Sequence, residues 1–203
     1  MLAIGLITHM RRFALDRDGS SALEFAYAFP VILLAVVGLL ELMMIMFVSS
    51  LMEGGLRDAS RYAITGALPD NGTREQAIVN IVNDRTLGLL DLTTADVRMR
   101  VYQSFDQVGQ PEPLIVDLNG NGRYDPGDSY TDLNGNGQWD EDMAETGSAG
   151  LSSEVVVYDL NVDWPLLTPL LAPFIGQNGI IKLGASIAVR NEPYSPTNTG
   201  ALP

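Results

Sequence analysis

The feature that most constrains this chain is an apolar run close to its N-terminus. Between Phe25 and Met52 the sequence contains one charged residue, Glu41. As a helix this run would be about 42 Å long, which exceeds the roughly 30 Å hydrocarbon core of a bilayer. We therefore predict a transmembrane helix whose ends reach the headgroup layers. A cleaved secretory signal is the alternative, but the run is long for one and no A-x-A-like site follows it.

Basic residues in front of the apolar run predict its orientation. Arg11, Arg12 and Arg17 belong to a leader, residues 1–19, and the positive-inside rule keeps such a segment in the cytoplasm. The acidic remainder of the chain is then expected on the other side of the membrane. Translation from Met10 in place of the first methionine is left open, because the residues before it are not typical of a targeting segment.

Composition excludes several classes of function. The chain has 203 residues, of which 46% are hydrophobic, enough for one domain with smaller pieces. A net charge of −13 argues against a nucleic-acid partner. The absence of cysteine excludes disulfides and thiolate metal sites, and one histidine, His9, cannot supply a multi-histidine metal site. With no G-x-S-x-G motif either, we expect no enzymatic activity.

Beyond the apolar run, hydrophobic periodicity predicts an α+β domain. Thr73 and Gln76 form a capping box ahead of apolar residues at helical spacing. Alternation of apolar and polar residues predicts half-buried strands over 97–102, 155–164 and 181–189. One helix and three strands, each with one apolar face, predict a helix packed on a three-stranded antiparallel sheet.

These patterns divide the chain into segments. Gly54 and Gly55 lie in the helix beyond the expected span and indicate either a hinge or an ordinary weak point. The expected segments are the leader (1–19), the transmembrane helix with its extension (20–66), the α+β domain (67–192) with an insert (112–150), and a disordered tail (193–203).

The insert contains a near-repeat of the pattern D-x-N-x-N-G-x-x-D. Side-chain oxygens at positions 1, 3, 5 and 9 and a glycine at position 6 are typical of a calcium loop, in which position 7 contributes its carbonyl. The candidate positions of the first copy are Asp117, Asn119, Asn121, Arg123, Asp125 and Asp128. Those of the second copy are Asp132, Asn134, Asn136, Gln138 and Asp140.

We therefore expect the insert to bind one or two Ca²⁺ ions with a structural role. The second copy has Met143 at position 12, where an acid is usual, so that Glu141, Asp142 or Glu145 would have to substitute. No amphipathic helices flank the copies, which makes them EF-hand-like loops and not EF-hands. The alternative is a solvated, disordered acidic loop.

The residues at the membrane boundary resemble a known processing site. The stretch from Gly19 to Pro30, GSSALEFAYAFP, is similar to a class III prepilin-type site of the tight-adherence (Tad/Flp) pilus system, and especially to TadE-like pseudopilins. The resemblance is best over residues 11–66 and 155–194. It implies that prepilin peptidase cuts after Gly19, leaving Ser20 as the new N-terminus and Glu24, followed by Phe25, as an early acid of the mature chain.

By this resemblance the protein is a minor pseudopilin or pilus assembly protein, single-pass in the bacterial inner membrane with a periplasmic domain. Its expected partners are the membrane, prepilin peptidase, and other pseudopilins or Tad machinery subunits. Glu24 could pair with the Ser20 ammonium of a neighbour, or serve only as an acid favoured by the helix dipole. An unprocessed, membrane-anchored, calcium-stabilised adhesive or binding domain is the alternative, and cleavage after Gly19 distinguishes the two.

Two further features of the sequence remain open. An ionised Glu41 inside the span would be costly, so this residue is expected to be protonated or to face a partner helix or polar pocket, and is a candidate intramembrane contact. The proline- and leucine-rich stretch Leu166–Phe174 predicts a loop packed on the core, or else a patch that touches the membrane or a partner pseudopilin.

Overall fold

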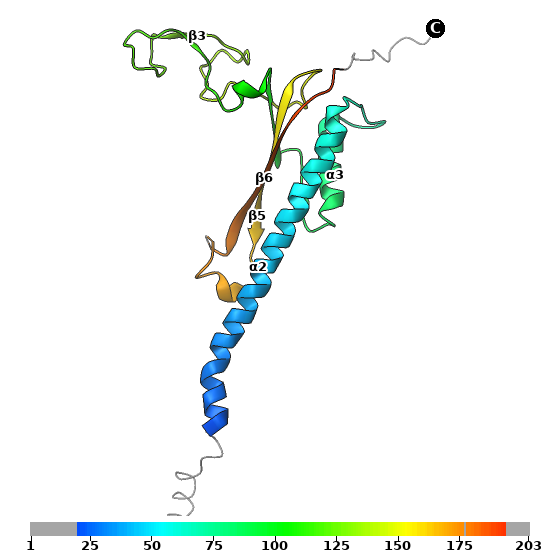
Figure 1. Cartoon of the computed structure of the whole chain (residues 1–203), viewed down its shortest axis with the longest axis vertical. Helices are drawn as coiled ribbons and strands as arrows, with labels where there is room; N and C mark the ends of the chain where they lie inside the picture. The colour runs from blue at the N-terminus through cyan, green and yellow to red at the C-terminus, as the bar shows by residue number, and fades with distance from the viewer. Residues whose placement is uncertain (1–19, 177, 194–203) are drawn as a thin grey trace, which may run out of the picture.

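A computed structural model describes residues 20–176 and 178–193, so that the leader and residues 194–203 of the expected tail lie outside the described residues. A long helix, α2 (Ser20–Ile64), runs along the molecule, and a small α+β domain is built against its second half (Figure 1). The other elements are α3 (Arg74–Arg85), β1 (Val97–Tyr102), η1 (Phe105–Gln107), β2 (Leu114–Val116), β3 (Ser129–Tyr130), β4 (Glu145–Thr146), β5 (Val155–Pro165), η2 (Pro169–Leu171) and β6 (Ile180–Arg190).

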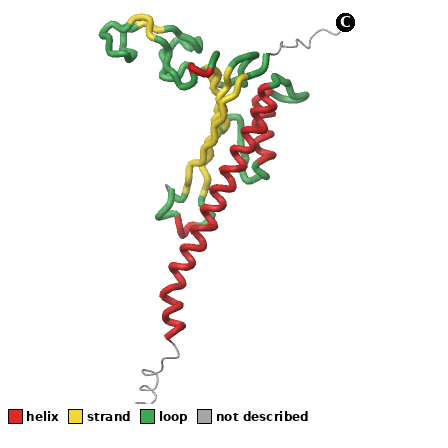
Figure 2. Tube along the Cα trace, viewed as in Figure 1, coloured by secondary structure: helices red, strands yellow, loops and turns green. Residues whose placement is uncertain are grey.

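Helix α2 has two halves that differ in burial. No residue from 21 to 40 is buried, and this half extends alone from the rest of the fold (Figure 2). From Glu41 onward one side of the helix is covered by the domain. The buried apolar residues of this second half recur at helical spacing, namely Val48, Met52, Leu56, Ala59 and Ala63. The apolar run predicted as one span is therefore divided between an uncovered half and a half that belongs to the domain core.

The sheet confirms the antiparallel arrangement and adds a strand. The three strands predicted from alternation are β1, β5 and β6, and the sheet order is β4-β1-β5-β6. The fourth strand, β4, pairs with β1 through Arg100↔Thr146 and Val101↔Glu145. The predicted three-stranded sheet is thus a four-stranded one, because the end of the insert returns to pair with β1.

Both faces of the sheet carry buried apolar residues, on the second face in a smaller cluster of Tyr102, Val155 and Val157 with Met143 and Ala144 of the insert. One face packs on α2 and α3 and forms the core, where cross-strand pairs such as Val156↔Val189 and Tyr158↔Ile187 lie. On the other face, Arg100 contacts Asp159 (Nε–Oδ2, 2.8 Å) and Asp142 (Nη1–Oδ2, 2.7 Å). The Tyr102 hydroxyl also donates to Asp142. The pKa of Tyr102 is raised, mainly because the side chain is partly buried and secondly because of its hydrogen bond to the Asp142 carboxylate. These contacts attach the end of the insert to the sheet.

Gly55 has a packing role in the contact between α2 and α3. The helix is continuous through Gly54 and Gly55. A Cβ atom at Gly55 would lie 3.1 Å from Cγ1 and 3.3 Å from Cα of Val82, a buried residue of α3. Close approach of the two helices therefore accounts for a glycine here, and the described helix has no break that would mark a hinge.

We predict that Gly55→Val lowers the free energy of unfolding by about 1–3 kcal/mol, because the larger side chain would push α3 away from α2. Gly54→Val is the matched control, since a Cβ there approaches only Nε of Arg85, at 3.8 Å. Unfolding of the detergent-solubilised full chain, followed by circular dichroism, measures both. Equal midpoints for the two variants would contradict the packing role.

Candidate functional site

Glu41 lies where the uncovered half of α2 meets the domain. Its side chain is 2% exposed. Its Oε1 accepts a hydrogen bond from the backbone N–H of Leu167 (2.9 Å), and its Oε2 accepts from the N–H (3.3 Å) and the hydroxyl (3.2 Å) of Thr168. Its own chain therefore provides polar surroundings of the kind expected for this acid. A buried carboxylate is tolerated when such donors satisfy it.

The loop that reaches Glu41 is shaped by prolines at its start. Pro165 ends β5 and Pro169 begins the short helix η2, so the intervening backbone leaves the strand ladder. The Leu166 N–H donates to the carbonyl of Gly179 (2.8 Å), which closes the loop at its base. The N–H groups of Leu167 and Thr168 thereby point at the helix. The proline- and leucine-rich stretch is thus a loop whose backbone is hydrogen-bonded to α2, while several of its apolar side chains stay exposed.

The uncovered half of α2 has the length of a membrane span. Within the described part of the chain, one helix is long and apolar enough to cross a membrane. Its uncovered residues 20–40 measure about 31 Å at the helical rise per residue, close to the roughly 30 Å of a hydrocarbon core. Its exposed side chains include Leu33, Leu34, Val36, Leu39 and Leu40. A span formed by these residues would end at Glu41 and would not contain it.

The residues that resemble a processing site lie at the other end of this half. Gly19 is outside the described residues, and Ser20 is the first residue of α2. Glu24 and Phe25 both lie on the exposed helix surface, where the Phe25 ring is 5.4 Å from that of Phe29. The first turns of α2 therefore present an acid beside aromatic side chains that no other described residue covers.

The two copies of the acidic repeat have the same local geometry. Asp117 accepts hydrogen bonds from the N–H groups of Gly120 and Gly122, both at 2.7 Å. Asp132 accepts in the same way from Gly135 (2.7 Å) and Gly137 (2.9 Å). Hydrogen bonds from these backbone groups, that of Gly122 more than that of Gly120, hold the pKa of Asp117 below its ordinary value. Each copy is thus a tightly curled loop organised by its first aspartate, at the end of the molecule far from the uncovered helix (Figure 1).

The amide groups inside these loops face the last aspartate of the motif. Oδ2 of Asp125 accepts from Nδ2 of Asn119 and of Asn121, both at 2.8 Å, and Asp140 is bonded in the same way in the second copy. The donor set is rich in the oxygen atoms that Ca²⁺ prefers. However, no three acidic or histidine side chains of the described residues come together in a group that could hold a metal ion.

Glu112 completes the second loop and is a residue that the sequence motif missed. In the first loop, Asp128 accepts from the N–H groups of Leu118 (3.0 Å) and Asp125 (2.9 Å). In the second, the equivalent N–H groups, those of Leu133 and Asp140, donate to Glu112 at 2.8 and 3.3 Å. Glu112 is 1% exposed. It takes the place of the missing acid at Met143, but it precedes the motif, so no spacing rule identifies it.

The three acids considered as substitutes have other surroundings. Asp142 is bonded to Arg100 and Tyr102 on the sheet, Glu145 lies in β4, and Glu141 is exposed. Two candidate positions remain, Arg123 and Gln138. Each donates its backbone N–H to the side-chain oxygen of the asparagine two residues earlier, at 2.7 Å.

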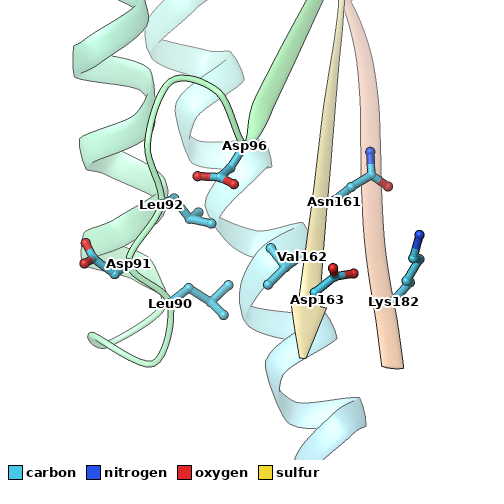
Figure 3. Close-up of a pocket in the computed structure, with 8 residues that line it drawn as sticks. All are labelled: Leu90, Asp91, Leu92, Asp96, Asn161, Val162, Asp163 and Lys182. Carbon is cyan, nitrogen blue, oxygen red and sulfur yellow. The ribbon is translucent and has the colours of Figure 1, made fainter. Parts of the chain in front are cut away.

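The domain also has an open groove of about 570 Å³ beside β5 (Figure 3). It lies between the loop after α3 and the strands, where Asp163 and Lys182 face each other across β5 and β6. Its lining residues are Leu90, Asp91, Leu92, Asp96, Asn161, Val162, Asp163 and Lys182. This set combines three carboxylates, Asp91, Asp96 and Asp163, with one lysine and one amide side chain.

Comparison with known proteins gives one match. A family model described as TadE-like protein matches residues 19–61. This range contains the processing motif, the uncovered half of α2 and most of its packed half. The match confirms the resemblance seen in the membrane-boundary residues, over this segment. No curated protein and no solved structure matches the chain.

We predict that Glu41→Ala frees the loop after β5, because two backbone N–H groups lose their acceptor. The expected loss is about 1–3 kcal/mol of local stability. Hydrogen exchange followed by mass spectrometry should detect it as faster exchange at Leu167 and Thr168. Glu53→Ala, an exposed glutamate of the same helix, is the control. Unchanged exchange in the Glu41 variant would contradict this role.

Proposed function

We propose a specific role for this protein from its TadE-like segment, residues 19–61, which indicates a Tad pilus-associated protein. The protein is a minor pseudopilin of a Tad-type pilus or secretion machine, cleaved after Gly19 and anchored in the inner membrane with its domain in the periplasm. The observation that carries the proposal is that the family match starts at Gly19 and covers a helix whose residues 21–40 are unburied.

The chemistry of the helix start supports assembly with like helices. Cleavage would leave an ammonium group on Ser20, about one helical turn from the exposed Glu24. In an apolar environment a carboxylate is stabilised by a paired cation. Pairing of Glu24 with the Ser20 ammonium of a neighbouring subunit would set the axial register of packed helices. This role is one of assembly and involves no catalysis by the chain itself.

A second function is favoured by one feature, the acidic insert. An unprocessed protein with the same anchor would present a calcium-stabilised domain for adhesion or binding. This alternative requires no cleavage after Gly19 and no peptidase. The state of the mature N-terminus therefore separates it from the pseudopilin proposal.

We predict that protein extracted from membranes of the native host begins at Ser20. Mass spectrometry of the intact chain tests this with and without prepilin peptidase. Gly19→Val should leave the leader attached, because the peptidase recognises the small residue at the cleavage point. Gly38→Val is the matched control, since a Cβ at Gly38 meets nothing within 4 Å. A leader that is retained in the unmutated protein would overturn the processing proposal.

We also propose that the insert binds one or two Ca²⁺ ions that keep it ordered. The repeated motif and its oxygen donors support this, as does the excess of acids over the single basic residue, Arg123, between Asp117 and Glu145. The asparagine amides would turn their oxygens to the ion. Asp128 would supply the last acid of the first loop and Glu112 that of the second. The ion would supply charge neutralisation and cross-linking of the loop, a structural contribution.

We predict that calcium raises the unfolding temperature of the full chain and that chelator reverses this, because an ion bound only by the folded loops stabilises them. Asp117→Asn should weaken binding at the first loop and Glu112→Gln at the second. Asp70→Asn, an exposed aspartate outside the insert, is the control. Calorimetry measures binding, and absence of heat and of a thermal shift at millimolar calcium would refute the calcium proposal.

A further inference from the structure

The loop between β5 and β6 is the part of the domain nearest the uncovered half of α2 (Figure 1). We call residues 165–176 and 178–180 the hairpin tip. No charged residue occurs between Asp163 and Lys182, although 18% of the whole chain is charged. The acid and the lysine that bound this stretch occupy opposite register positions on β5 and β6. The hairpin thus changes from charged to uncharged as it approaches the helix.

Large apolar side chains point outward from the hairpin tip. Phe174 is 76% exposed, Leu167 is 56% exposed and Ile180 is 42% exposed. Leu171 is the large apolar side chain of the tip that is buried, whereas these three are largely left uncovered by the described residues. Three large exposed apolar side chains within one short uncharged loop give it the composition of a contact surface.

Glu41 fixes the position of the hairpin tip along the axis of α2. Its hydrogen bonds to Leu167 and Thr168 hold the loop at the point where the uncovered half of the helix ends. That half, residues 20–40, measures about 31 Å and matches the roughly 30 Å of the hydrocarbon core. If the uncovered half lies in the bilayer, the tip lies at the boundary between acyl chains and headgroups.

We propose that the hairpin tip is a second membrane contact, in which Leu167, Phe174 and Ile180 insert into this boundary beside the helix. A lipid surface is the occupant that the observations favour, because the patch is uncharged, lies beside the exposed apolar surface of the span, and is held at its end. Leucine and phenylalanine are side chains that bind at this depth. The proposal rests on the membrane anchor and is independent of processing and pilus assembly.

The absence of cysteine allows a direct test in the full chain. Single cysteines replace Phe174 or Leu167, carry a bimane fluorophore, and are reconstituted in phosphatidylcholine–phosphatidylglycerol vesicles at low protein-to-lipid ratio. Lipids with a nitroxide near the headgroup quench a fluorophore at that depth. Leu39→Cys reports the anchor itself, because Leu39 is exposed and lies on the span close to the same boundary. Leu151→Cys is the matched control, because it is an exposed leucine at the other end of β5.

We expect a blue shift and nitroxide quenching at Phe174→Cys and Leu167→Cys, with quenching at least half that of Leu39→Cys and none at Leu151→Cys. Tip positions as unquenched as Leu151→Cys, with Leu39→Cys quenched, would overturn the hairpin contact and leave the anchor intact. Lack of quenching at Leu39→Cys would overturn both. A blue shift at the tip positions that appears only at high protein-to-lipid ratio, without nitroxide quenching, would assign the patch to a second copy of the chain and refute the lipid contact.

Discussion

The architecture depends on how one carboxylate in an apolar helix is satisfied. Glu41 is buried, and the backbone of the β5–β6 loop donates hydrogen bonds to both of its oxygens. An unsatisfied buried carboxylate would be strongly destabilising, whereas one with several donors is tolerated. The loop is therefore held at this turn of α2. This contact decides which part of an otherwise uniform apolar run is covered by the domain and which part is left for lipid or for other helices.

A second polar contact has a comparable role at the far end. Arg100 bridges Asp142 of the insert and Asp159 of β5, so that a strongly acidic segment is attached through a cation on the sheet. Glu112 acts within the insert, where it joins the start of the segment to the second loop. The two ends of the domain are thus organised by acids whose partners lie far away in the chain.

Elements with local patterns could be predicted from the sequence. The Thr73 hydroxyl accepts from the N–H of Gln76 (3.2 Å), which is the N-cap bond of the predicted capping box, and strict alternation identified β1, β5 and β6. Strand β4 could not be predicted, because its two residues have no pattern of their own and depend on pairing with β1. The role of Glu41 depends on partners more than a hundred residues away, and periodicity carries no information about such contacts.

The unbroken course of α2 has a mechanical consequence. Since Gly55 is locked against Val82 and no break occurs before Ile64, the domain is attached to a rigid lever and not to a flexible tether. The arm from Glu41 to Ile64 is about 36 Å long. A tilt of about 20°, ordinary for a helix in a bilayer, would swing the far end of the arm sideways by about 12 Å. Small changes in the tilt of the uncovered half of α2 within a membrane would thus produce large displacements of the acidic insert.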